Sequence, residues 1–183
     1  IAGKAEIAAA CQAAIDAQAA WIDMGLEARC AIFEKCAEML AGDWRMKVNA
    51  STMLNQSKTA FQAEIDSACE LIDFWNFNCH YARQFHDMYQ PLVSPTGVKN
   101  STEIRPLEGF VLAITPFNFS SIAANLPSAP AILGNTAVWK PSRNSYHSNY
   151  VLMELMMEAG VPAGVINFVP SSGPDISEVC MSN

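Results

Sequence analysis

A chain of 183 residues with 51% hydrophobic and 16% charged residues has the composition of a packed globular protein rather than a disordered one. Its formal net charge of -7, without a cluster of lysines and arginines, argues against nucleic acids and anionic membranes as main partners. No apolar run approaches the roughly 18 residues that a membrane-spanning helix needs, so we expect no membrane span.

The first part of the chain, residues 1–90, is predicted to be helical because apolar residues recur there at helical spacing. One helix begins near Lys4, and three more are predicted at residues 28–40, 44–56 and 62–89. On the last of these, Ile65, Ala68, Cys69, Ile72 and Trp75 are predicted to share a buried face. We interpret the aromatic and methionine side chains of this part as core packing rather than as a cofactor site.

Residues 91–109 are predicted to form an extended connector. Pro91, Pro95, Gly97 and Pro106 exclude a long helix in this stretch. Within the connector, residues 102–105 have the pattern of a short strand.

Residues 110–183 alternate between apolar strands and helices. Strands are predicted at 110–114, 136–140 and 165–169, with helices at 120–133, at 146–159 and from 173 onward. The strands are continuously apolar, which indicates burial on both faces and a parallel sheet. The chain is therefore predicted to be an α/β protein with a helical amino-terminal layer followed by half of a doubly wound parallel sheet. Because such a half seldom makes a complete enzyme, we expect the chain to be part of a longer protein.

Six cysteines form neither a C-x-x-C pair nor a regular disulfide framework. Most stand in helical patterns beside Ala, Leu or Phe, where a free thiol behaves as a small hydrophobic group. We favour reduced core cysteines over disulfides, which implies a reducing compartment. The three histidines have no ligand spacing relative to the cysteines, so we expect no zinc site.

Three predicted loops follow the strands, at the edge where open parallel sheets bind ligands: residues 115–119, 140–143 and 170–174. None contains the G-x-G-x-x-G pattern, so neither the ordinary dinucleotide fingerprint nor a P-loop is supported. Lys140 ends its strand, where its ammonium could bind ribose hydroxyls or a phosphate, or simply extend into water. Asn118, between two phenylalanines, could donate to a developing oxyanion or satisfy its own turn. The residues alone leave these alternatives open.

The order and spacing of several segments resemble the signature of the aldehyde dehydrogenase superfamily. These segments are TPFNF at 115–119, GNTAVWKPS at 134–142, AGVP at 159–162 and VINFVP at 165–170. Parts of residues 58–74, together with residues 107–110, resemble more narrowly the pyrroline-5-carboxylate dehydrogenases. The resemblance covers almost the whole chain and implies an incomplete aldehyde dehydrogenase-like cofactor domain.

The resemblance implies a role for each matching residue. Asn118 matches the oxyanion-hole asparagine, and Phe119 an aromatic wall of the aldehyde pocket. Glu70 matches a carboxylate near the cationic nitrogen of the substrate, although the residue pattern alone suggests an exposed helix charge. The implied contacts to the cofactor are Thr115, Pro116, Phe117, Lys140 and Ser142. The family also needs a nucleophilic cysteine and a glutamate base, which we expect in downstream sequence.

The implied activity is the NAD-dependent oxidation of glutamate semialdehyde, formed from pyrroline-5-carboxylate, to glutamate in proline breakdown. Arg143 stands where many relatives carry an acidic residue, so NADP is an alternative cofactor. Alternative functions are an aldehyde dehydrogenase for another substrate, or an inactive cofactor-binding or structural fragment. The resemblance further implies a small-molecule aldehyde as partner, a homo-oligomer, and location in the mitochondrial matrix, or in the cytoplasm of a bacterium.

Overall fold

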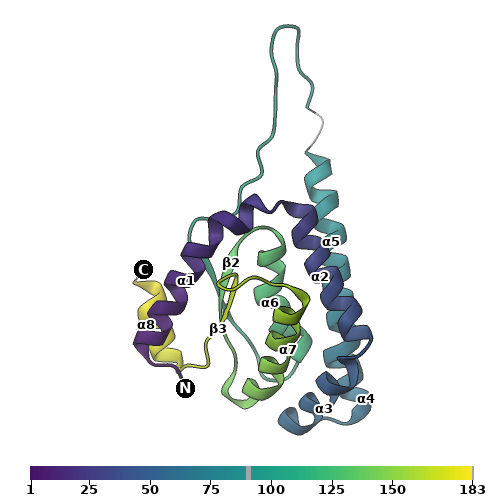
Figure 1. The fold of residues 1–183 in the computed structure, drawn as a ribbon, viewed down its shortest axis with the longest axis vertical. Helices are drawn as coiled ribbons and strands as arrows, with labels where there is room; N and C mark the ends of the chain where they lie inside the picture. The colour runs from purple at the N-terminus through teal and green to yellow at the C-terminus, as the bar shows by residue number, and fades with distance from the viewer. Residues whose placement is uncertain (90–91, 183) are drawn as a thin grey trace.

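The first part of the chain is helical in the computed structural model, which describes residues 1–89 and 92–182 (Figure 1). All four predicted helical stretches are present, and the last is divided into three consecutive pieces. The helices are α1 (Lys4–Asp23), α2 (Leu26–Ala41), α3 (Arg45–Gln56), α4 (Ala60–Ala63), the π-helix η1 (Glu64–Cys69) and α5 (Glu70–Met88). None of the described helices is long and apolar enough to cross a membrane.

A capping box at Thr59 explains why α4 begins at Ala60. Its hydroxyl accepts a hydrogen bond from the backbone N–H of Gln62, and the Gln62 side chain accepts one from the backbone N–H of Thr59. The π-helical turn η1 then separates α4 from α5 and contains Ile65, so this residue does not follow the α-helical spacing of the face of α5. For this reason the predicted buried face is wrong at Ile65, whose side chain is 45% exposed, whereas Trp75 is fully buried.

The second part is a three-stranded parallel sheet with the order β1-β2-β3, which confirms the predicted alternation of strands and helices. Sequence and structure agree on the bounds of the first two strands, and the third is one residue shorter at each end than predicted. The elements are β1 (Phe110–Ile114), α6 (Ser120–Ile132), β2 (Thr136–Lys140), the 3-10 turn η2 (Arg143–Ser145), α7 (Tyr146–Ala159), β3 (Ile166–Phe168) and α8 (Gly173–Met181).

Helices cover both faces of the sheet, as the continuously apolar strands indicated (Figure 1). On one face, Trp139 of β2 packs in a large core with residues of α2, α5, α6 and α7. On the other face, Val138 packs with Ile7 and Cys11 of α1 and Ile176 of α8. Cys11, like the core cysteines Cys30, Cys36 and Cys79, is buried as predicted for a small hydrophobic side chain.

A buried arginine joins the ends of two helices from different parts of the chain. Arg29 of α2 donates from Nε to the carbonyl of Ile132 in α6 at 3.0 Å, and from Nη1 to the carbonyls of Trp21 and Ile22 in α1 at 3.2 Å each. These carbonyls lie in the last turns of their helices, where they have no partner within the helix. A cation also interacts favourably with the negative end of a helix dipole, so this contact connects α1 to α6.

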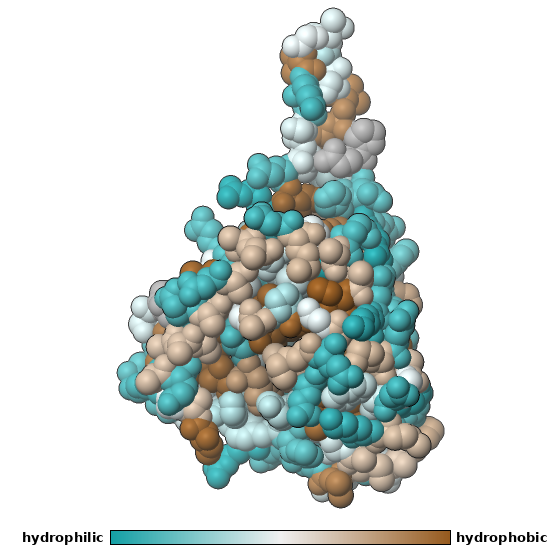
Figure 2. Space-filling view, viewed as in Figure 1, coloured by the Kyte–Doolittle hydropathy of each residue, from teal (hydrophilic) through white to brown (hydrophobic). Residues whose placement is uncertain are grey.

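The connector, residues 92–109, extends away from the body as an arm and returns to it at Leu107, whose backbone N–H donates to Asn135 Oδ1 at 2.9 Å (Figures 1 and 2). It carries exposed apolar side chains, including Val93 and Leu107, among polar ones. The prediction of a strand at 102–105 is wrong, because these residues have no regular secondary structure. A strand needs a neighbouring backbone to pair with, and the projecting arm meets no strand among the described residues.

Substitution of Gly164 should test how closely α1 packs against the turn before β3. Its φ is +86°, and a Cβ there would lie 2.7 Å from the carbonyl oxygen of Ala13 and 2.8 Å from Cβ of Ala17. Gly164→Ala should lower the free energy of unfolding by about 3 kcal/mol, from backbone strain plus overpacking. Urea denaturation measures this loss.

Gly97→Ala is the matched control, because φ is +82° there and no atom lies within 4 Å of the added Cβ. Backbone strain alone should cost about 1 kcal/mol. Equal losses for the two variants would show that α1 does not pack tightly at Gly164.

Candidate functional site

The loops that follow β1 and β2 leave the sheet side by side. The two strands pair in parallel, with Ile114 opposite Lys140. The pairing continues one residue further, where the backbone N–H of Thr115 donates to the carbonyl of Lys140 at 3.1 Å. Thr115 and Lys140, both predicted site residues, are therefore neighbours at the carboxyl edge of the sheet.

Thr115 is buried and its hydroxyl is part of the core. The indole N–H of Trp139 donates to Thr115 Oγ1 at 2.9 Å. A buried indole needs an acceptor, because an unpaired N–H in the core is costly. Thr115 consequently anchors the start of the first loop to the adjacent strand.

Lys140 presents a half-buried ammonium at the same edge. Its Nζ donates to the carbonyl of Pro141 at 3.2 Å. An ammonium has three donors, so two remain for a ligand. Among residues 1–89 and 92–182, no carboxylate forms an ion pair with Lys140. Ser142, half-buried, follows in this second loop, where its carbonyl accepts from the backbone N–H of Ser145 at 3.1 Å.

The first loop exposes an aromatic ring and an amide. Pro116 is half-buried, and Phe117 is 57% exposed. The side chain of Asn118 is exposed and has no hydrogen-bond partner within the described part of the chain. The interpretation that Asn118 satisfies its own turn therefore has no hydrogen bond to support it, and the amide is free to donate to a ligand.

The beginning of α6 is contacted by charged residues of the helical part. Lys58 Nζ lies 4.3 Å from the centre of the Phe119 ring and forms an ion pair with Asp66. The hydroxyl of Ser121 donates to Glu70 Oε2. Glu70 is half-buried, so the expectation of an exposed helix charge is wrong because Ser121 of α6 packs against the start of α5.

The structure therefore arranges the predicted residues in two groups. Thr115 and Lys140 are joined through their backbones, and Phe119 and Glu70 lie at the start of α6. Lys58 and Ser121 were not predicted as site residues. Lys58 lies in a segment that resembles the pyrroline-5-carboxylate dehydrogenases, but only the packing of the helical part against α6 shows its contact with Phe119 and that of Ser121 with Glu70.

The third predicted loop, 170–174, is engaged by other parts of the chain. The backbone N–H of Ala2 donates to the carbonyl of Pro170 at 2.8 Å, and the hydroxyl of Tyr146 donates to the carbonyl of Ser171 at 3.2 Å. These contacts occupy backbone groups of the loop. The structure thus connects this loop to the start of the chain and to the start of α7, and gives it no hydrogen bond to Thr115 or Lys140 among the described residues.

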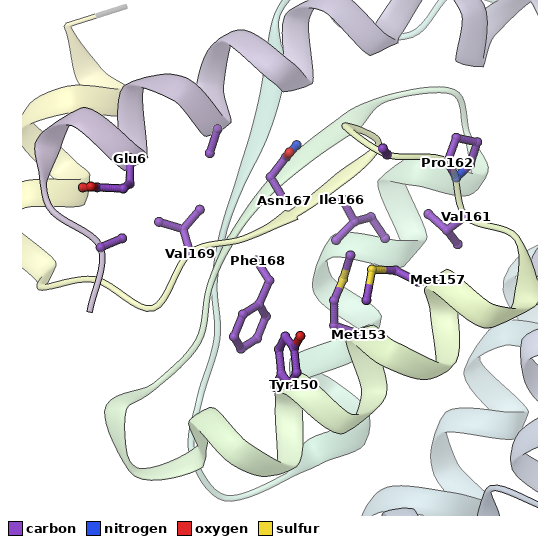
Figure 3. A pocket seen from close by; sticks show the side chains of 13 residues that line it. Glu6, Tyr150, Met153, Met157, Val161, Pro162, Ile166, Asn167, Phe168 and Val169 are labelled. Atoms are coloured by element: carbon purple, nitrogen blue, oxygen red, sulfur yellow. The ribbon is translucent and has the colours of Figure 1, made fainter.

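A cavity of about 530 Å³ lies beside β3, between α1 and α7 (Figure 3). It is lined mainly by apolar side chains, among them Tyr150, Met153 and Phe168. None of the predicted site residues lines it. The cavity is therefore separate from the loops that follow β1 and β2.

Comparisons with known proteins identify relatives along the whole chain. A profile of the aldehyde dehydrogenase family matches residues 1–183. The mitochondrial delta-1-pyrroline-5-carboxylate dehydrogenase of Homo sapiens is 43% identical over 182 residues, covering 100% of this chain and 32% of that protein. The delta-1-pyrroline-5-carboxylate dehydrogenase of Agaricus bisporus is 45% identical over 170 residues, covering 93% of this chain and 31% of that protein.

A solved structure gives the same result for the fold. The crystal structure of the Delta-pyrroline-5-carboxylate dehydrogenase from Mycobacterium tuberculosis bound with NAD has a TM-score of 0.95 and 49% identity to this chain. The match covers 100% of this chain and 34% of that one. The chain thus spans about a third of the length of these relatives.

Replacement of Thr115 should test whether its hydroxyl anchors the first loop. Thr115→Val keeps the shape but leaves the buried indole N–H of Trp139 without an acceptor. The free energy of unfolding should fall by about 1–3 kcal/mol, the cost of an unpaired buried polar group. Thr115→Ser, which retains the hydroxyl, should lose less; equal losses in urea denaturation for both variants would contradict the anchoring role.

Proposed function

This chain belongs to the aldehyde dehydrogenase family, and on that premise we propose that it forms the cofactor side of an NAD-dependent dehydrogenase for glutamate semialdehyde. The substrate is the open form of pyrroline-5-carboxylate, and the product is glutamate. The observation that carries the proposal is the pairing of Thr115 with Lys140, which joins the two loops of the candidate site. The relatives named above, one of them bound with NAD, support the same activity.

The loops after β1 and β2 offer groups that suit a dinucleotide. The half-buried ammonium of Lys140 has donors free for ribose hydroxyls, and the exposed ring of Phe117 offers an apolar surface. Thr115, Pro116 and Ser142 complete the proposed contacts. When bound, NAD supplies the hydride acceptor for oxidation of the aldehyde. The residues of this chain orient it at the carboxyl edge of the sheet, where ligands of parallel sheets bind.

Asn118 is proposed to stabilise the negative charge that develops on the aldehyde oxygen. Its side-chain amide is exposed and unpaired within the described residues, so it can donate without losing an existing hydrogen bond. Donors directed at a developing oxyanion lower the barrier because they interact more strongly with the transition state than with the substrate.

Glu70 and Phe119 are proposed to face the substrate. A half-buried carboxylate favours a nearby ammonium or iminium group, such as the cationic nitrogen of this amino-acid substrate. Phe119 would form an aromatic wall of the aldehyde pocket. Its contact with Lys58 and the hydrogen bond from Ser121 to Glu70 hold both side chains at the start of α6.

The catalytic thiol is proposed to belong to the remainder of the protein. Burial raises the pKa of the Cys36 thiol to about 12, and burial together with the neighbouring Cys11 raises the pKa of Cys180 to about 12. A nucleophilic cysteine needs a lowered pKa and access to the substrate, so these two are unsuited to the reaction. The contact with Cys79 lowers the pKa of Cys30, but Cys30 is fully buried and cannot reach a substrate. The glutamate base is likewise assigned to the remainder of the protein.

The proposal extends to assembly and location. We assign the full-length protein a homo-oligomeric state and a place in the mitochondrial matrix, or in the cytoplasm if the source is a bacterium. The relatives from Dictyostelium discoideum and Homo sapiens are named as mitochondrial.

The second candidate function is an aldehyde dehydrogenase with another substrate or with NADP. Arg143 is exposed at the start of η2, next to the second loop, where its guanidinium can donate hydrogen bonds to a 2′-phosphate. Faster turnover of an uncharged aliphatic aldehyde than of glutamate semialdehyde, or a preference for NADP, would favour this candidate.

Replacement of Asn118 in the full-length protein tests the oxyanion role. Asn118→Ala should lower kcat with glutamate semialdehyde by about 10²–10³, the usual effect of losing one oxyanion donor. The Kd for NAD, measured by calorimetry, should not change. Asn76→Ala, at an exposed position of α5, serves as control; unchanged kcat in Asn118→Ala would contradict the assigned role.

Replacement of Lys140 tests the contact with the cofactor. Loss of a charged hydrogen bond is worth about 1.5–3 kcal/mol, so Lys140→Ala should weaken NAD binding about 10- to 100-fold. Calorimetric titration of the full-length protein with NAD provides the measurement. Lys35→Ala, at an exposed position of α2, should bind NAD normally. Equal affinity of Lys140→Ala and the unmodified protein would remove Lys140 from the site.

A further inference from the structure

The end of α3 reaches the first turns of both helices that follow the candidate loops. Gln56, the last residue of α3, donates from Nε2 to Ser120 Oγ at 2.6 Å and to Ser148 Oγ at 3.0 Å. Ser120 is the first residue of α6, and Ser148 lies in the first turn of α7. Both serines are fully buried. A single amide thus links the starts of two helices that are distant in the sequence.

Two neighbouring side chains of α3 strengthen this link. The hydroxyls of Thr52 and Ser120 are hydrogen-bonded at 3.1 Å. Asn55 Oδ1 accepts from the backbone N–H of Ser148 at 3.0 Å, which satisfies one of the free donors in the first turn of α7. Four hydrogen bonds of 2.6–3.1 Å, each buried or partly buried, therefore hold α3 against α6 and α7.

The backbone conformation of Ser57 sets the direction in which the chain leaves α3. Ser57, which follows Gln56, has a φ of +54° and is the one non-glycine residue with a positive φ in the described part of the chain. Such a conformation is costly and persists only where surrounding contacts determine it. It turns the chain so that Gln56 contacts Ser120 while Lys58 contacts the ring of Phe119.

These contacts fix the positions of the ends of both candidate loops that lie away from the sheet, at the starts of α6 and α7. At the sheet, the loops begin together, because Ile114 pairs with Lys140. At the helices, they end together, because Gln56 bonds both Ser120 and Ser148. The loops that carry Asn118 and Ser142 are thus held at both ends, once by backbone pairing and once by this side-chain amide.

We propose that Gln56 is a positioning residue of the cofactor site, setting the distance between the loop of Asn118 and the loop of Lys140 and Ser142. The inference rests on the proposed function. Gln56 acts through Ser120 and Ser148, and it touches neither cofactor nor substrate. Its Oε1 is buried without a partner among the described residues, so the amide serves as a donor to the two serines.

Gln56→Met in the full-length protein tests the proposal, because methionine keeps the length of the side chain but cannot donate. Misplacement of the two loops should raise the Kd for NAD and lower kcat/KM for glutamate semialdehyde, each by about tenfold. Calorimetry and steady-state kinetics, both well below the temperature of unfolding, give the two values. A purely structural role would lower the Tm and leave both values unchanged.

Gln18→Met is the matched control. Gln18 also donates from Nε2 to two acceptors, the carbonyls of Leu107 and Gly109 at 2.8 and 2.9 Å, but at the opposite, amino edge of β1. It should bind NAD and turn over substrate as the unmodified protein does. Equal losses in Gln18→Met and Gln56→Met would overturn the proposal.

A double-mutant cycle tests whether Gln56 acts through the serines. The double variant Ser120→Ala/Ser148→Ala should show the same loss of kcat/KM as Gln56→Met. Addition of Gln56→Met to this double variant should change kcat/KM less than twofold, because the contacts of Gln56 with the two serines are already absent. Additive losses would overturn the proposal. If Gln56→Met does not fold, the Ser148→Ala variant tests the proposal by itself. An unchanged Kd for NAD and an unchanged kcat/KM in Ser148→Ala would overturn the positioning role of Gln56.

The same measurements distinguish a failure of the positioning role of Gln56 from a failure of the proposed function. If the unmodified protein oxidises glutamate semialdehyde and Lys140→Ala weakens NAD binding, the function stands. Unchanged values in Gln56→Met then refute the positioning role alone. If the unmodified protein binds no NAD, both the function and the positioning role are refuted.

Discussion

The parallel register of β1 and β2 is the constraint on which the candidate site depends. It places Ile114 opposite Lys140, and the backbone N–H of Thr115 continues the pairing to the carbonyl of Lys140. The hydrogen bond from Trp139 then anchors the Thr115 side chain. Since Trp139 is fully buried and its N–H requires an acceptor, a change of register would cost both core packing and this hydrogen bond. The core of the protein therefore specifies where its two candidate loops begin.

The helical part does more than cover the two faces of the sheet. It contacts three consecutive residues at the start of α6: Lys58 lies over Phe119, Gln56 donates to Ser120, and Glu70 accepts from Ser121. Polar contacts depend on direction as well as distance, so they restrict rotation and sliding of α6 more than apolar packing does. The residues on either side of Asn118 are thereby oriented by segments far away in the sequence.

In the proposed enzyme, this third of the protein would bind and orient, and the rest would supply the reacting thiol. The division is physically consistent with the cysteines described here. Cys36 has a raised pKa because it is buried, whereas Lys140 and Asn118 retain donors that a ligand can use. Rigid donors at a sheet edge and a nucleophile from another segment can then meet around the substrate.

The sequence by itself determined the helices, the first two strands and their parallel arrangement, because spacing of apolar residues reports local geometry directly. It also determined the family, through motifs around Asn118 and Lys140. Only the tertiary structure decided that residues 102–105 are not a strand, that Ile65 is exposed within a π-helical turn, and that Glu70 and Gln56 contact α6. The reason is that strand pairing and side-chain hydrogen bonds depend on a partner distant in the chain, and no local pattern identifies that partner.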